Sequence, residues 1–125
     1  MAMEMHPAMT AMHHWILGAA TGDWTRLVGM LAGSVTFHVP VEGFAGVRHG
    51  AADAIRFFEW LADSVRADLV VHSVLTGEAG VAFEVQVTGT MHGEPFTQRL
   101  CLVFEVRDGL VHHFREYLAW PGGLR

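Results

Sequence analysis

The chain has little of what several functional classes require. Its 125 residues include one cysteine, Cys101, so no disulfide can form within the chain. Only eight residues are lysine or arginine, against 13 acidic ones, and they are scattered. This excludes a nucleic-acid-binding surface and polybasic attachment to a membrane, since both need clustered positive charge. No apolar run approaches the roughly 20 residues of a transmembrane helix, and residues 1–6 lack the basic start of a signal peptide. We therefore expect a cytoplasmic protein without nucleic-acid or membrane partners.

What is abundant is apolar surface. Half of the residues (51%) are hydrophobic and 17% are charged, which excludes disorder. The length predicts a single domain over residues 1–125. For a domain of this size, so much apolar surface predicts an internal cavity lined with apolar residues or a buried subunit interface.

Hydrophobic spacing predicts three helices followed by strands. Apolar residues recur at helical spacing from Ala8 to Ala19, and Thr21-Gly22 ends this helix. Asp23 is placed to cap a second helix with an apolar stripe from Trp24 to Leu31, which Gly33-Ser34 ends. A third helix covers 51–65, after a loop at 40–50. The predicted strands cover 35–39, 68–76, 80–90, 95–106 and 110–119. Asp108-Gly109 lies between two apolar runs and is a strong hairpin signal.

Helices that precede an antiparallel meander predict an α+β fold. Three N-terminal helices would pack on one face of a strongly curved, mostly antiparallel sheet. Three short motifs add to this prediction: Gly22-Asp-Trp24, Ala54-Ile55 with Phe57-Phe58, and Val103-Phe-Glu-Val with Arg115-Glu-Tyr117. In these motifs and in its element order, from Trp15 to Tyr117, the chain resembles the nuclear-transport-factor-2-like (NTF2-like) superfamily. That cone-shaped fold includes ketosteroid isomerases, SnoaL-like polyketide cyclases and limonene-type epoxide hydrolases, and the fold alone does not settle function.

The resemblance implies a deep apolar pocket lined by one face of each strand. Matched to the epoxide hydrolases, Glu116 takes the place of the carboxylate that activates water, and an apolar pocket would raise its pKa toward neutrality. His38 and Glu84 are the further catalytic candidates. The expected ligand-binding residues are Trp15, Thr36, Gln86, Gln98, Leu100, Leu102, His112, Phe114 and Leu118, with Ala82 on the same wall.

Two departures from the family pattern weaken specific activities. Glu84 and Gln86 stand where the epoxide hydrolases carry an arginine and an acidic residue. The general acid of those enzymes is therefore missing, unless Glu84 and Glu116 share a proton so that one of them stays protonated. The two-donor oxyanion hole of ketosteroid isomerases is also missing, because Trp15 and Leu102 occupy its positions. Isomerase or cyclase chemistry therefore ranks slightly above epoxide hydrolysis.

No cofactor or metal is expected. Gly43, Gly46 and Gly50 lack the strand–turn–helix setting of a phosphate-binding loop. The adjacent pairs His13-His14 and His112-His113 point apart, so neither makes a bidentate metal site. Two other functions stay open, a non-catalytic ligand-binding protein with the same pocket and a protein-interaction module.

An apolar outer sheet face predicts a homodimer formed sheet to sheet. The residues expected on that face are Phe83, Val85, Val87, Val103, Val111 and Tyr117. Cys101 alternates with the proposed lining residues Leu100 and Leu102 and so lies on the other face of its strand. It is expected to be a small buried residue rather than a nucleophile.

Overall fold

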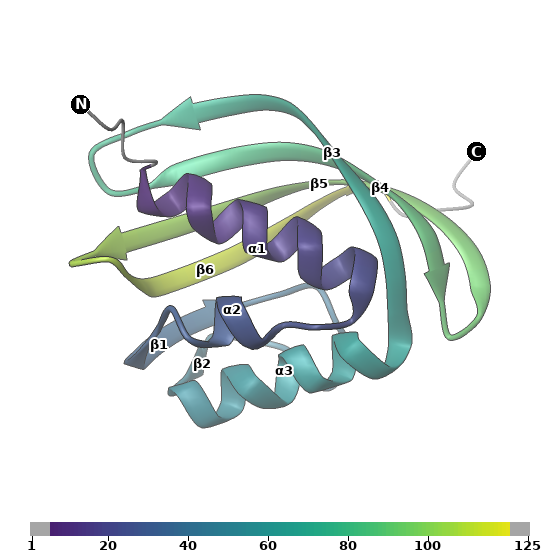
Figure 1. Ribbon diagram of the computed structural model, residues 1–125, viewed down its shortest axis with the longest axis horizontal. Helices are drawn as coiled ribbons and strands as arrows, with labels where there is room; N and C mark the ends of the chain where they lie inside the picture. The colour runs from purple at the N-terminus through teal and green to yellow at the C-terminus, as the bar shows by residue number, and fades with distance from the viewer. Residues whose placement is uncertain (1–5, 121–125) are drawn as a thin grey trace.

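The computed structural model describes residues 6–120, which form helices packed on a curved sheet (Figure 1). The helices are α1 (Pro7–Thr21), α2 (Thr25–Val28) and α3 (Ala51–Ser64). The strands are β1 (Leu31–His38), β2 (Arg48–His49), β3 (Val65–Thr76), β4 (Val81–Met91), β5 (Glu94–Arg107) and β6 (Leu110–Trp120). None of the helices in this part of the chain is long and apolar enough to cross a lipid bilayer.

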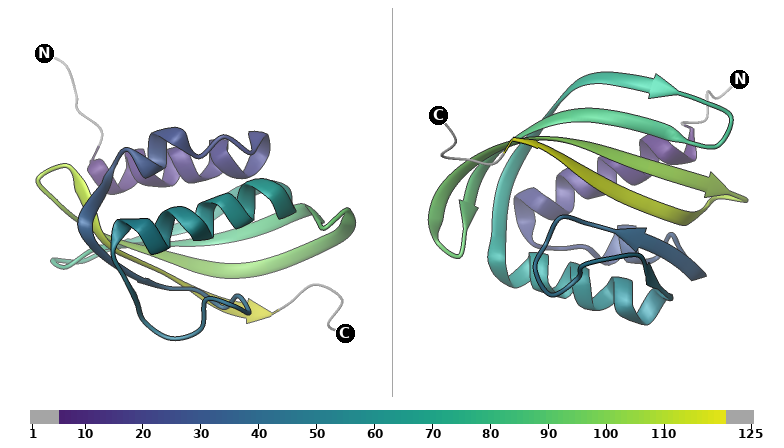
Figure 2. Two further views of the ribbon diagram at one scale, coloured as in Figure 1. Left: turned by 90° about the horizontal axis from the view of Figure 1, so that it is seen from below. Right: turned by 180° about the vertical axis from the view of Figure 1, so that it is seen from behind.

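The sheet has the strand order β2-β1-β6-β5-β4-β3. Strands β1 and β6 run parallel, and every other neighbouring pair is antiparallel. Both long helices lie on one side of the sheet, which bends around them (Figure 2, left). This confirms the predicted α+β cone with its strongly curved, mostly antiparallel sheet.

An aromatic cluster fills the space between the helices and the sheet. Trp15 of α1 lies at its centre, with ring centroids 5.4–5.9 Å from those of Trp24, Phe58, Phe104 and Phe114. Such edge-to-face aromatic pairs stabilise a core by about 0.5–1.5 kcal/mol beyond the burial of their area. The helices are therefore held on the sheet mainly by large rings contributed from four different elements and the segment before α2.

Local turn chemistry sets two of the three long hairpins, β4–β5 and β5–β6. Asp108 and Gly109 both have positive φ, at 53° and 75°, as a two-residue turn with the twist of the strands requires. His92 and Gly93 repeat the arrangement between β4 and β5, at 51° and 79°. The predicted hairpins are therefore present where the sequence places them.

Several boundaries differ from those predicted. The second helix is a single turn, and residues 31–34 belong to β1 instead, because Ala32 and Val35 bury against the helices. Strand β3 begins at Val65, directly after α3, because the backbone of Val65 turns extended there. The short strand β2 was not predicted; it pairs with β1 opposite Thr36 and Phe37.

Candidate active site

A cavity of about 290 Å³ lies between the two long helices, α1 and α3, and strands β3 to β6 of the sheet. Its wall is apolar for most of its extent and is shared by α1, α3, the segment around Trp24, the loop after β1, and strands β3 to β6. The lining residues are Trp15, Ala19, Trp24, Pro40, Val41, Glu42, Trp60, Leu61, Val65, Leu69, Val87, Met91, Phe96, Gln98, Leu100 and Glu116. The cavity is thus built from almost every element of the fold.

Glu116 is the carboxylate on this wall. Strand β6 presents it on the helix side of the sheet, and the antiparallel register places it opposite Leu102, which is 1% exposed. The residue is half-buried because part of its surface faces the cavity. No described side chain forms a hydrogen bond or ion pair with its carboxyl group. Burial alone raises the pKa of Glu116 to about 7, since removal from water disfavours the ionised form.

Trp24 brings an unpaired donor to the same wall. The side chain is 6% exposed, and among the described residues nothing accepts a hydrogen bond from its indole Nε1. A buried donor without a partner costs about 1–3 kcal/mol. The cavity therefore combines an unpaired carboxyl group with a tryptophan whose N–H is unsatisfied.

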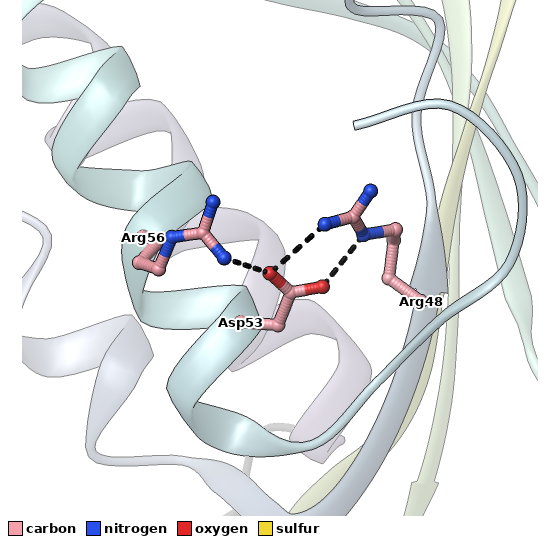
Figure 3. Close-up of polar contacts among 3 residues, drawn as sticks. All are labelled: Arg48, Asp53 and Arg56. Carbon is pink, nitrogen blue, oxygen red and sulfur yellow. Dashed lines mark hydrogen bonds and ion pairs between the residues drawn. The ribbon is translucent and has the colours of Figure 1, made fainter. Parts of the chain in front are cut away.

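The loop after β1 closes one side of the cavity through Pro40, Val41 and Glu42. Arg48 and Asp53 hold the far end of this loop to the first turn of α3 (Figure 3), with 2.6 Å between Nε and Oδ2. Arg56 donates to the other oxygen of Asp53 at 2.7 Å. Both guanidinium groups lie within 6 Å of the ring of Phe44, at 5.7 and 5.9 Å, and Phe44 is buried.

Four of the predicted site residues lie on the cavity wall. They are Trp15, Gln98, Leu100 and Glu116. Leu102 and Phe114 also point to the helix side, but both are buried in the aromatic core, where Phe114 stacks on Phe37 at 4.9 Å. Leu118 is 36% exposed and does not line the cavity. The roles proposed for these residues in binding or catalysis stay predictions.

On β1 and β4 the predicted lining face is wrong. Thr36, His38, Ala82, Glu84 and Gln86 lie on the outer face of the sheet and do not line the cavity. Even-numbered residues of β4 lie opposite odd-numbered residues of β5, for example Glu84 opposite Cys101. The strands take this orientation because burying their apolar side chains stabilises the fold more than burying the polar ones would. The residues that face the helices are Val35 and Phe37 on β1 and Val81, Phe83, Val85 and Val87 on β4.

The polar residues that were predicted to line the cavity have hydrogen-bond partners on the outer face of the sheet instead. Thr36 Oγ1 lies 2.6 Å from His113 Nδ1, and His38 Nε2 lies 3.5 Å from the hydroxyl of Tyr117. Glu84 accepts a hydrogen bond from Ser73 across the β3–β4 pair. A shallow hollow of about 590 Å³ lies beside Thr36 and His113, larger than the cavity but polar and open. Glu84 and His38 therefore cannot act on a ligand that Glu116 contacts.

His112 leaves the predicted face because of a β-bulge. The pairing shifts between Glu105–His113 and Val106–Val111, so His112 is the extra residue. Its Nδ1 lies 3.2 Å from a guanidinium nitrogen of Arg107, at the opposite end of β6 from Glu116. A bulge of this kind is not visible in the alternation of the sequence.

The predicted dimer face also needs correction. Phe83, Val85, Val87 and Val111 are buried in the core, at 6% exposure or less. Val103 and Tyr117 do lie on the outer face, Tyr117 with 51% exposure, beside Cys101, which is half-buried. Burial and the nearby charge of Glu84 raise the pKa of Cys101. A homodimer through this face stays a prediction, with a more polar surface than expected.

Sequence reasoning missed most of the cavity wall. Trp24, Trp60, Met91 and Phe96 carry no polar signal, and Glu42 lies in a loop whose position depends on the tertiary structure. One signal could have indicated Trp24. It directly follows Asp23, whose side chain accepts a hydrogen bond from the backbone N–H of Thr25, so Trp24 lies just before α2 and not on its apolar stripe. Nowhere in residues 6–120 do three histidine, cysteine or acidic side chains converge in a way that could hold a metal ion.

The fold and sequence match known proteins. Residues 12–114 match the SnoaL-like domain. No curated protein matches the chain. An NTF2-like protein from Anabaena variabilis is 28% identical, covering 97% of this chain and 98% of its own, with a TM-score of 0.81. A putative isomerase from Rhodopseudomonas palustris is 21% identical (94% and 92% covered, TM-score 0.80). An epoxide hydrolase of the limonene-hydrolase-like type from Mycobacterium tuberculosis is 19% identical (90% and 82% covered, TM-score 0.72).

The last two likenesses are distant and concern the fold alone. The match to the SnoaL-like domain spans the chain from the second turn of α1 into the first half of β6, and it ends two residues before Glu116. By this match and by its NTF2-like fold, the chain belongs to the SnoaL-like domain family.

Proposed function

We propose that this chain is a small-molecule enzyme in which Glu116 moves a proton on an apolar, oxygen-containing ligand held in the cavity. The observation that carries the proposal is an unpaired carboxyl group in an apolar cavity, with its pKa raised to about 7. A carboxyl group with this pKa is divided between acid and base at neutral pH, which suits it to both halves of a proton transfer.

An isomerase or cyclase fits this arrangement better than an epoxide hydrolase. Glu116 would take the proton from a carbon next to a carbonyl group, and the C–H electron pair would form the enolate. The same carboxyl group would then return the proton to a second carbon of the conjugated system. One titratable group suffices for this sequence, whereas epoxide opening also needs an acid in the cavity. Glu84 and His38 lie outside it, and Glu42 lies on its exposed side.

Trp24 is the candidate for stabilising the negative oxygen. Its N–H lacks a partner in the described structure, so a ligand oxygen within reach would satisfy it. One neutral donor stabilises less charge than the two of an oxyanion hole. This restricts the proposal to carbon acids whose enolate is already stabilised by conjugation. The volume of about 290 Å³ is at the low end for ligand pockets and favours ligands of one or two rings.

The test is proton exchange on a panel of compact β,γ-unsaturated cyclic ketones in D₂O, followed by NMR. We expect deuterium incorporation and a shift of the double bond into conjugation. Glu116→Gln should slow both by roughly 10²–10⁴-fold, the usual contribution of a general base. The rate should rise with pH and level off above pH 7, as Glu116 ionises.

Glu84→Gln is the matched control, because Glu84 is a glutamate of the same sheet on the outer face. Its exchange rates should equal those of the wild type. The second candidate, a non-catalytic ligand-binding protein, uses the same cavity. Ligands that raise the melting temperature without any exchange above the buffer rate would contradict the enzyme proposal and favour that candidate.

A further inference from the structure

Within the described part of the chain, both charged residues that line the cavity are acidic. Glu116 lies on its wall, and Glu42 lies on the exposed side, in the loop after β1. The other elements around Glu116 contribute no titratable lining residue among those described: α1 gives Trp15 and Ala19, and α3 gives Trp60 and Leu61. Strands β3, β4 and β5 add Val65, Leu69, Val87, Met91, Phe96, Gln98 and Leu100. Among residues 6–120, no positively charged side chain lines the cavity to pair with a bound anion.

The neutral part of the wall favours cations for a second reason. Trp15, Trp60 and Phe96 line the cavity, besides Trp24, whose unpaired N–H favours an oxygen acceptor instead. The face of an aromatic ring carries partial negative charge and attracts an ammonium group within about 6 Å, with tryptophan the most effective. An aromatic wall and an unpaired carboxylate together form a cation-binding environment.

From this distribution of charge we propose that the cavity binds compact apolar amines as ammonium ions, in preference to the isosteric alcohols and carboxylates. A bound ammonium group would supply the partner that the carboxyl group of Glu116 lacks. A bound carboxylate would be desolvated without a counter-ion and would be repelled by Glu42 and by ionised Glu116. The inference rests on the proposed function only in taking the same cavity as the ligand site.

The sharpest probe is one apolar frame with three head groups. Adamantan-1-amine, adamantan-1-ol and adamantane-1-carboxylate differ almost solely in charge. Isothermal titration calorimetry at about pH 8 should show the amine binding roughly tenfold more tightly than the alcohol, as a charge-assisted hydrogen bond implies. The carboxylate should bind more weakly than the alcohol. At about pH 5.5 the advantage of the amine should fall to the small part that the aromatic wall supplies, because Glu116 is then mostly protonated.

Glu116→Gln should lose most of the preference for the amine over the alcohol at pH 8, and the small preference that the aromatic wall and Glu42 supply should no longer change with pH. Glu84→Gln, on the outer face, should keep the full selectivity of the wild type. A measurement without substitution provides a second line of evidence: carbon NMR of labelled glutamate should show that the amine lowers the pKa of Glu116.

Three results would overturn the inference: equal binding of amine and alcohol at pH 8, binding of the carboxylate as tightly as the amine, or no binding of any of the three. Persistence of the full wild-type amine preference in Glu116→Gln would also overturn it. The two proposals fail separately. Amine selectivity without proton exchange would contradict only the enzyme, and Glu116-dependent exchange without amine selectivity would contradict only this inference.

Discussion

Leu102 and Glu116 lie directly opposite each other across β5 and β6, both on the side of the sheet that the helices cover. Leu102 is 1% exposed, so a fully buried leucine is the cross-strand neighbour of the cavity carboxyl group. This pairing helps to explain why burial, and no neighbouring charge, raises the pKa of Glu116 to about 7. Leu102 is one of the apolar neighbours that bury the candidate catalytic group.

Glu116→Gln should make the protein more stable at neutral and higher pH. The folded pKa of Glu116 is about 7, above its ordinary value of 4.5. The folded state therefore binds more protons between these values, and the contribution of Glu116 to stability falls as pH rises from about 4.5 to about 7. The full loss is on the order of 3 kcal/mol.

Urea unfolding of wild type and variant between pH 4 and pH 8 checks this. Only the difference between the two curves is informative, because burial also lowers the pKa of His14 and of His113. The neutral forms of these histidines add stability that is lost as pH falls through the range. A difference curve that is flat with pH would show that Glu116 titrates normally.

Gly89→Ala should destabilise the protein by roughly 1–3 kcal/mol, the usual cost of overpacking. A Cβ at Gly89 on β4 would lie 2.1 Å from the carbonyl oxygen of Arg66 and 2.6 Å from Cα of Ala67, and backbone atoms of β3 cannot easily move away. Gly33→Ala on β1 is the matched control, because a Cβ there meets nothing within 4 Å. Thermal unfolding should show a clear loss for Gly89→Ala alone, and equal melting temperatures would contradict the close approach.

Asp53→Asn should loosen the loop that carries Glu42. The substitution removes the negative charge that Arg48 and Arg56 share at 2.6 and 2.7 Å (Figure 3). We expect a loss of roughly 0.5–1 kcal/mol, typical of an ion pair that water partly screens. Hydrogen exchange should show faster opening of residues 39–47, with little change in β4 and β5. Because the arginines lower the pKa of Asp53, its stabilising effect should disappear as pH falls through that lowered value.

Arg115→Gln should raise the pKa of His113. Burial lowers that pKa first, and the positive charge of Arg115 lowers it further. Removing the guanidinium group also frees Glu105, to which Arg115 is bound at 2.7 Å, and a free carboxylate favours protonated histidine. Both effects have the same sign, so proton NMR should show His113 titrating closer to 6.5. A further decrease would contradict this account of the outer-face network.

Val103→Arg tests the predicted homodimer. Val103 lies on the outer face opposite Arg115 of β6, so a second arginine would add like charge to any sheet-to-sheet interface. Sedimentation velocity should show a dimer for the wild type and a monomer for the variant. Ala20→Arg on the exposed side of α1 is the control and should leave the assembly unchanged. A monomeric wild type would contradict the prediction directly.

Features that depend on local chemistry could be predicted from the sequence. The Asp108-Gly109 hairpin follows from two adjacent residues that accept positive φ, and α3 follows from its apolar stripe. The placement of Glu116 came from the resemblance to the epoxide hydrolases and not from local chemistry; the structure has Glu116 on the helix side, opposite Leu102.

The register between β4 and β5 could not be obtained in the same way. Both faces of β5 carry apolar residues, with Leu102 on one and Val103 on the other, so alternation does not choose between them. On β4 the alternation itself favours burying Phe83 and Val85, and the family resemblance pointed to the opposite face. The wall formed by Trp60, Phe96 and Glu42 depends on how separate elements pack, which no short stretch of sequence encodes.

The strand order has a consequence for how the chain is made. β6 lies inside the sheet, between β1 and β5, although it is synthesised after the other five described strands. Until residue 120 has left the ribosome, β1 with β2 and the β3–β5 meander have no strand to join them, and each exposes an unpaired edge. The cavity needs β6 as well, since β6 carries Glu116. The nascent protein therefore acquires its complete sheet and its candidate site in the same late step.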